Sequence, residues 1–217
     1  CALPIYLIDQ TSRAAVQRAR SRGKKLAKEG MLKALDVATG ELLWQTAEKL
    51  SACYLWMGDG VLLVTKGRTS AYAAEDGSLL WARPVPGHPY PVIVGDTVYL
   101  GHKAVDLHTG MPRLRSAPLT GTELPWRLTY KAGCGSFSGS PHALFCRSGA
   151  AGIVDLARDS GMSWLGQVRP SCWVNMIAAG GLLLMPEGAS SCSCPYNYQT
   201  SLAMVPDDRS EQWFVFP

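Results

Sequence analysis

Two eleven-residue segments of this chain repeat the same pattern of residue types. The first is ALDVATGELLW, Ala34–Trp44, and the second is AYAAEDGSLLW, Ala71–Trp81. Both place Gly at the seventh position, Leu-Leu at the ninth and tenth, and Trp at the eleventh. The glycines Gly40 and Gly77 are 37 residues apart. A period of this size is typical of a supersecondary unit that recurs along a chain, so the pattern predicts a repeat architecture.

Further copies continue the pattern toward the C-terminus. The Asp-x-x-Thr-Gly core of the first copy, which starts at Asp36, returns in VDLHTGMPRLR with Asp106 and Gly110. A looser copy, VDLARDSGMSW, contains Gly161. The second copy has Asp in place of Thr before its glycine, and the third lacks the final Trp. The wider gap before Gly161 requires an insertion, which residues 120–141 supply with many turn-forming residues.

The sequence between the turn glycines indicates short β-strands. Runs such as GVLLVTKG and HALFCRSG are apolar or alternating and are bounded by Gly, Asp or Pro. Glycine suits the intervening turns because it accepts a positive φ, and an Asp a few residues earlier can accept backbone N–H groups and fix the loop. We therefore interpret Asp36 and Asp106 as turn supports, not as catalytic carboxylates.

Large rings follow two of the turns, since Trp44 and Trp81 come four residues after their glycines and can pack on a neighbouring unit. Short antiparallel strands, polar turns and a packing Trp are typical of a β-propeller blade. The prediction is an all-β, partial β-propeller of about four to five four-stranded antiparallel blades. After a partial first blade, the blades centre on residues 52–84, 90–117, 133–168 and 172–217. Residues 1–32 form a separate N-terminal segment, and residues 33–217 form the blades.

The N-terminal segment is strongly basic. Residues 1–33 contain eight Lys and Arg against Asp9 and Glu29, whereas the rest of the chain has 13 basic and 15 acidic residues. A capping Thr11 or Ser12 and a narrow apolar stripe predict a short helix that ends near Gly23. A basic helix can contact nucleic acid or anionic lipid, but no aromatic residues are interleaved for stacking. We favour a solvated surface helix and expect no nucleic-acid partner.

Composition and the chain start add two expectations. Hydrophobic residues make up 47% and charged residues 18%, which is typical of a globular protein. No run reaches the roughly 18 apolar residues of a membrane-spanning helix, so we expect no transmembrane segment. The start, Cys1-Ala2-Leu3-Pro4-Ile5, resembles the translation of a common sequencing adapter, which is one reading of it as an assembly scar. A mature lipoprotein also begins with Cys, and both alternatives stay open.

The repeat Ala-x-Asp-x-x-Thr-Gly-x-x-x-Trp resembles that of PQQ-like (pyrroloquinoline quinone repeat) β-propellers. This superfamily includes quinoprotein dehydrogenases and outer-membrane assembly lipoproteins, and the resemblance covers about residues 33–217. The segment from Gly133 to Met204 resembles the C-terminal part of large uncharacterised bacterial PQQ-like repeat proteins. Such propellers usually have seven or eight blades, so the resemblance implies that further blades belong to a longer parent chain. It also implies a periplasmic or otherwise exported location.

Six cysteines follow Cys1, and five of them lie in the C-terminal part of the chain. These five are Cys134, Cys146, Cys172, Cys192 and Cys194. In an exported protein such a cluster indicates disulfides, with Cys134–Cys146 the favoured pair and Cys172 with Cys192 or Cys194 next. The alternative is a zinc site at Cys172, Cys192 and Cys194, although the usual Cys-x₂-Cys spacing is absent. We favour disulfides and expect no metal.

Two functions from different classes remain. The first is a non-enzymatic propeller that binds a protein or cell-envelope component as a scaffold. The second, implied by the resemblance, is part of a PQQ-dependent dehydrogenase, with Trp173, Asn175 and Glu187 as weak candidates for cofactor binding. The adjacent cysteine pair of quinoproteins is absent, as are a Gly-x-Ser-x-Gly elbow and a His-Glu-x-x-His motif. We therefore favour the scaffold, with no catalytic residues and no established cofactor.

Overall fold

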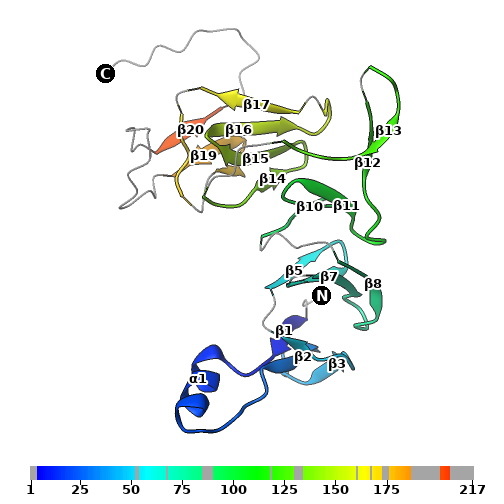
Figure 1. Ribbon diagram of the computed structural model, residues 1–217, viewed down its shortest axis with the longest axis vertical. Helices are drawn as coiled ribbons and strands as arrows, with labels where there is room; N and C mark the ends of the chain where they lie inside the picture. Colours follow the sequence, from blue (N-terminus) through cyan, green and yellow to red (C-terminus); the bar gives the residue numbers. More distant parts are fainter. Residues whose placement is uncertain are drawn as a thin grey trace. The chain divides into compact units, whose positions relative to one another are not determined.

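The computed structural model describes residues 4–51, 54–66, 68–84, 90–117, 119–129, 134–159, 161–166, 168–172, 176–186 and 201–205. In these residues the chain has one α-helix and many short strands, arranged in small antiparallel sheets (Figure 1). The chain divides into two compact units, Cys1–Arg127 and Leu128–Pro217. Each unit is described by itself. Among the described residues, no helix has the length and apolar character needed to cross a bilayer.

The single described helix is α1, Arg13–Ser21. Ser12 caps its N-terminus, because the Ser12 hydroxyl accepts a hydrogen bond from the backbone N–H of Ala15 at 3.2 Å. Gly23, with φ of 69°, follows the last turn. The helix therefore begins and ends where the sequence predicts.

The first sheet contains the strand that precedes this helix in the sequence and the strands that follow it. Its order is β1 (Ile5–Asp9), β2 (Glu29–Leu35) and β3 (Leu42–Gln45), and the short β4 (Leu50–Ser51) also pairs with β2. The N-terminal segment thus supplies a strand of the first blade, and the boundary expected at residue 32 falls inside β2.

The second blade has four antiparallel strands in sequence order. They are β5 (Tyr54–Gly58), β6 (Val61–Lys66), β7 (Arg68–Ala73) and β8 (Leu79–Arg83). Successive side chains of a strand point to opposite faces of the sheet. Val61 and Leu63 of β6 accordingly pack with the third blade, whereas Leu62 and Val64 pack with the first. The unbroken apolar run of β6 follows from burial on both faces.

The third blade departs from the four-stranded prediction. It consists of β9 (Val92–Val94), β10 (Thr97–Leu100) and β11 (Lys103–Asp106). In place of a fourth strand there is only a bridge between Val105 and Pro112, with the N–H of Arg113 donating to the carbonyl of Ala104 at 3.0 Å. Proline has no N–H to continue a strand ladder, which accounts for the reduced pairing.

The inserted segment forms a hairpin after the third blade. Its strands are β12 (Leu114–Ser116) and β13 (Glu123–Pro125), which pair antiparallel. Trp126 and Arg127 then return to the third blade, where Arg127 bridges Lys103 of β11.

The outer strands of the first two blades contain the same irregularity. The register of β2 with β3 shifts next to Leu43, and that of β7 with β8 shifts next to Leu80. Each shift is a β-bulge, in which one extra residue disturbs the alternation of side chains. Consecutive leucines therefore both face solvent on each outer strand: Leu42 and Leu43 on β3, Leu79 and Leu80 on β8.

The repeat tryptophans join each blade to the next. The Trp44 ring lies against Gly77, and the Trp81 ring lies against Gly110. Their indole N–H groups donate to Ala74 at 3.1 Å and to Leu107 at 2.8 Å, in each case the carbonyl three residues before the contacted glycine. Both rings pack on the neighbouring blade, but Trp81 is 7% exposed whereas Trp44 is only partly buried.

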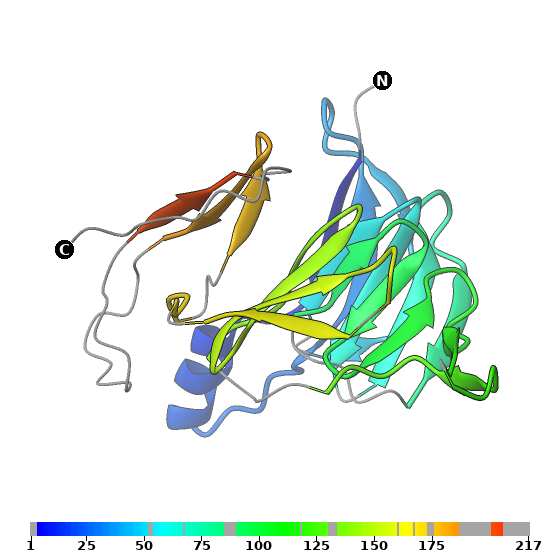
Figure 2. The same cartoon turned by 90° about the horizontal axis from the view of Figure 1, so that it is seen from above.

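The second unit contains two sheets (Figure 2). Buried side chains of both sheets belong to one cluster. One has the order β14 (Ser138–Ser140), β15 (Ala143–Ser148), β16 (Ala150–Asp155) and β17 (Met162–Leu165). The other contains β18 (Ile177–Ala179), β19 (Leu182–Met185) and β20 (Leu202–Met204). Phe145 and Met185 are among the buried residues between them.

Candidate functional site

The carboxylates of the repeat are engaged in turns. One Asp36 oxygen accepts hydrogen bonds from the backbone N–H groups of Ala38 and Thr39, both at 2.8 Å. These bonds hold the pKa of Asp36 below its ordinary value. The backbone of Gly40, which follows, has a positive φ of 73°. Asp36 thus stabilises a turn.

Asp106 has the same role in the third copy. One of its oxygens accepts from the N–H groups of His108 and Thr109 at 3.0 and 2.8 Å. Burial alone would raise the pKa of Asp106, but the bonds from Thr109 and the nearby Arg113 outweigh it and lower the pKa. This low pKa is explained by turn formation and needs no catalytic role.

The candidate cofactor residues of the sequence lie outside the described residues. This holds for Trp173, Asn175 and Glu187, and also for Cys192 and Cys194. Across the described ranges, His, Cys, Asp and Glu side chains do not gather in groups of three or more.

Three cysteines are described, and all have free thiols. Cys134 is exposed, whereas Cys146 and Cys172 are buried. Burial raises the pKa of the Cys146 thiol to about 12. A guanidinium nitrogen of Arg147 lies 3.4 Å from the sulfur of Cys172. The disulfide Cys134–Cys146 is not formed in this structure, and it stays a prediction.

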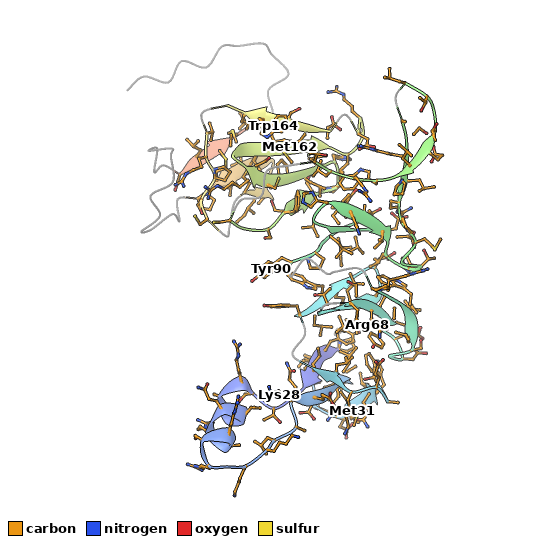
Figure 3. All side chains as sticks on the ribbon, in the orientation of Figure 1. Lys28, Met31, Arg68, Tyr90, Met162 and Trp164 are labelled. Atoms are coloured by element: carbon orange, nitrogen blue, oxygen red, sulfur yellow. The ribbon has the colours of Figure 1, made fainter. Side chains whose placement is uncertain are left out.

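Aromatic side chains gather beside β5. The ring of Tyr90 lies 5.7 Å from that of Tyr54 and 6.3 Å from that of Trp56, measured between centroids. Figure 3 shows Tyr90 on the β5 side of the second blade, away from β8. The indole nitrogen of Trp56 is buried without a hydrogen-bond partner in the structure.

The second unit contains an apolar cavity of about 610 Å³. Its walls come from the β14–β17 sheet and from the β18–β20 sheet, with Phe145, Leu165 and Met204 among the lining residues. Ser140 and His142 are its polar lining residues. The cavity therefore lacks the converging charged groups that chemistry on a polar substrate requires.

A second cavity, in the first unit, is small and basic. Its volume is about 320 Å³, and it lies between the end of β8, strand β11 and the returning segment after β13. We call it the basic pocket. Its lining residues are Arg83, Pro84, Lys103, Ala104, Val105, Gly110, Pro112, Pro125, Trp126 and Arg127.

The cations of the basic pocket face no lining carboxylate. Arg83, Lys103 and Arg127 line it, and the structure gives them no ion pair with a described residue. The nearest acidic groups in the sheet serve Arg113 instead, which lies 2.5 Å from Asp96 and 3.1 Å from Asp106. The pocket is thus an electrostatically unmatched site.

Sequence reasoning did not find this pocket. Arg83, Lys103 and Arg127 come from three separate segments, and no local run of charge marks any of them. The basic segment that the sequence does show lies in residues 1–33, elsewhere in the fold. Two of these cations come together through the antiparallel bridge between Lys103 and Arg127, a pairing of segments that are distant in the sequence.

The fold and its repeat contacts define the class of this protein. Consecutive small antiparallel sheets, the first three joined in succession by Trp–Gly contacts, are typical of the blades of a β-propeller-type repeat protein. Residues 28–110 match the family model PQQ_2, described as "Outer membrane protein assembly factor BamB". This part of the chain is therefore similar to PQQ-like propeller repeats, and the match agrees over these residues with the resemblance noted in the sequence.

Two solved structures are similar to the chain. One is BamB from Moraxella catarrhalis, with 18% identity, a TM-score of 0.45, and coverage of 73% of this chain and 52% of that one. The other is the computationally designed Ika8 protein, with 16% identity, a TM-score of 0.46, and coverage of 73% and 50%. The chain thus spans about half the length of each. The comparison with curated proteins gave no match.

Proposed function

We propose that this chain is part of a non-enzymatic β-propeller that binds a protein or other component of the bacterial cell envelope and serves as a scaffold. The periplasm or another exported location is part of this proposal. It is supported by the family match and by the use of the repeat residues in turns and packing. The observation that carries it is a row of exposed apolar side chains on β3, on β8 and in residues 111–114 after the third blade.

We call these side chains the outer apolar row. Its members are Leu42, Leu43, Leu79, Leu80, Met111 and Leu114. Each is between 43% and 56% exposed. Figure 1 shows β3 and β8, which hold four of them, following one another along the same side of the unit. Large apolar side chains in one row are a feature of surfaces that bind other proteins.

Contacts within the unit connect the row. Trp44, next to Leu43, lies on Gly77, two residues before Leu79. A guanidinium nitrogen of Arg83, at the end of β8, lies 3.1 Å from the sulfur of Met111. The row therefore follows three successive blades. Because β3 and β8 are the last strands of their sheets, they also have backbone groups that an added strand of a partner can pair with.

The second candidate is a fragment of a PQQ-dependent oxidoreductase. The resemblance of the repeat to that of quinoproteins favours it, although the same fold supports unrelated functions. Its cofactor candidates are Trp173, Asn175 and Glu187. The sequence lacks the adjacent cysteine pair expected beside the quinone, so we rank it second.

Site-specific photo-crosslinking tests the scaffold proposal. A photoreactive amino acid replaces Leu43, Leu80 or Leu114 in the parent protein, expressed in its own cell envelope. Glu75, an exposed residue of the same unit outside the row, is the control position. We expect one defined adduct from the row positions and none from Glu75. Leu80→Lys should abolish the adduct formed at Leu43, whereas Glu75→Lys should not.

Two results would contradict the proposal. One is the absence of any adduct from all three row positions. The other is dye-linked alcohol or sugar oxidation that requires PQQ and Ca²⁺ and is lost in the double variant Asn175→Ala, Glu187→Ala. That second result would establish the oxidoreductase.

A further inference from the structure

We propose that the basic pocket of the first unit binds an anionic ligand with a flat apolar body, through a carboxylate or phosphate group held by Arg83, Lys103 and Arg127. This binding site borders the outer apolar row, because the guanidinium of Arg83 contacts Met111. Its lining includes no member of the row, and the proposal does not depend on the scaffold function. It is based on the charge, walls and cross-strand pairing of the pocket.

The lining of the basic pocket carries positive charge and no negative charge. Three cationic side chains line about 320 Å³, and the lining includes no acidic residue. Asp96 and Asp106 are held by Arg113, and Glu123 accepts a hydrogen bond from Ser116. The carboxylates of this region are therefore already engaged. The field in the pocket attracts an anion and is not cancelled by neighbouring residues.

Two of the cations, Lys103 and Arg127, lie next to each other. They form an antiparallel bridge, so they lie directly opposite each other across two chain segments. Side chains at such positions are close neighbours, and like charges there repel and destabilise the pairing. A bound anion between the two cations would turn this repulsion into attraction. The cross-strand pairing thus points independently to a negatively charged ligand.

Trp126 and three prolines form apolar walls of the basic pocket. Trp126 is 7% exposed, and its ring packs edge-on against Tyr99 with centroids 5.1 Å apart. The backbone N–H of Trp126 donates to the carbonyl of Arg113 at 2.7 Å. Pro84, Pro112 and Pro125 are further lining residues. Proline side chains lose little conformational entropy when a ligand binds. This surface suits a flat apolar group attached to the anion.

The volume limits the size of the ligand. Small-molecule sites usually begin at roughly 300 Å³, so this pocket takes a small molecule or the end of a larger one. The proposal therefore concerns a single anionic group with a ring-sized apolar body.

Four probes with matched shapes test this proposal on the full chain. They are phenylacetate, phenyl phosphate, inorganic phosphate and the neutral phenylacetamide. Binding is followed by NMR at the indole N–H of Trp126, which is assigned by its loss in Trp126→Phe. We expect saturable shifts with phenylacetate or phenyl phosphate, weakened by added salt. The tighter of the two identifies the ligand class as carboxylate or phosphate ester.

Substitutions assign the binding to the pocket. Arg127→Gln and Lys103→Gln should each weaken binding of the anionic probes by about tenfold, the usual effect of losing one hydrogen bond to a charged group. Lys28→Gln is the matched control, because Lys28 is an exposed cation of the same unit outside the pocket lining (Figure 3). It should leave binding unchanged.

A second readout separates ligand binding from a structural role. If Lys103 and Arg127 repel each other in the free protein, Arg127→Gln should raise the melting temperature without ligand while it weakens binding. A lower melting temperature would mean that Arg127 stabilises the fold and would overturn the proposal. Equal binding of phenylacetamide, or unchanged binding in both variants, would also overturn it. Equal binding of phosphate and phenyl phosphate would overturn the role given to Trp126.

Discussion

The indole of Trp81 lies so close to Gly110 that a Cβ added to this glycine would stand 2.5 Å from a ring carbon. The same ring donates its N–H to the carbonyl of Leu107. Trp44 and Gly77 repeat the arrangement one blade earlier. The Trp of one repeat copy therefore packs against the Gly of the following copy.

We expect Gly110→Ala to destabilise the protein more than Gly40→Ala. Both glycines have a positive φ, 66° and 73°, but a Cβ at Gly40 meets nothing within 4 Å. Gly40→Ala should cost about 1–2 kcal/mol from backbone strain alone. Gly110→Ala should add roughly 1–3 kcal/mol for the clash with Trp81. Urea denaturation of the two variants measures the difference, and equal midpoints would contradict the contact.

The partner of that glycine provides a further test. Trp81→Ala should cost about 3–5 kcal/mol, since the ring is buried. In the Trp81→Ala background, the added cost of Gly110→Ala should fall to that of Gly40→Ala, because the clashing ring is gone. A double-mutant cycle by urea denaturation measures this coupling. Strict additivity would show that the two residues do not act together.

We expect Asp106→Ala to lower stability by about 1–2 kcal/mol, because the N–H groups of His108 and Thr109 lose their acceptor. Asp106→Asn keeps an acceptor oxygen and should cost less. The lowered pKa of Asp106 makes its contribution present above the ordinary pKa of 3.8 and lost as the pH falls below it. Thermal melts of both variants at neutral and acid pH measure this. A loss with Asn as large as with Ala would contradict the turn role.

The thiols should differ sharply in reactivity in the reduced, folded protein. Cys134 is exposed and should alkylate readily near neutral pH. Burial and a pKa of about 12 should protect Cys146 until the protein unfolds. Timed alkylation followed by peptide mass spectrometry measures both rates, and comparable rates would contradict the burial of Cys146.

The same method tests the disulfide prediction. Material purified without reductant from its native compartment should contain the bridge Cys134–Cys146. Six or seven free thiols in that material would contradict both the disulfides and the oxidising location.

Stability should fall at alkaline pH through Tyr72. Burial, and then the nearby Glu48, raise the pKa of Tyr72 to about 12 from 10.0. The protonated phenol is thus favoured in the folded state, so its contribution is complete below pH 10 and is lost as the pH rises toward 12. Urea midpoints across this range should drop less in Tyr72→Phe than in the wild type. Glu48→Gln should reduce the drop partially, and parallel curves for all three proteins would contradict the assignment.

The sequence pattern predicts the blades because turn chemistry and strand periodicity are local properties. Gly40, Gly77, Gly110 and Gly161 all have a positive φ in the structure. The helix cap at Ser12 is equally local. The reduced fourth strand of the third blade also has a visible signal, Pro112, although the repeat pattern alone led us to expect a full strand.

Other features depend on contacts between distant segments. The pairing of β1 with β2 places the N-terminal segment in the first blade, and no local pattern in residues 5–9 signals that partner. The basic pocket requires Arg83, Lys103 and Arg127 to meet after folding. Whether Trp44 is as buried as Trp81 depends likewise on which side chains surround it.

The link from each tryptophan to the next blade also bears on how the first unit reaches its native state. The hydrogen bonds of Trp44 and Trp81 span only 30 and 26 residues. Each interface thus joins neighbouring repeats only, and repeat proteins of this kind can fold by adding neighbouring units in succession. Amide hydrogen exchange should therefore show β6, buried on both faces, as the last strand to open, with protection decreasing outward on either side.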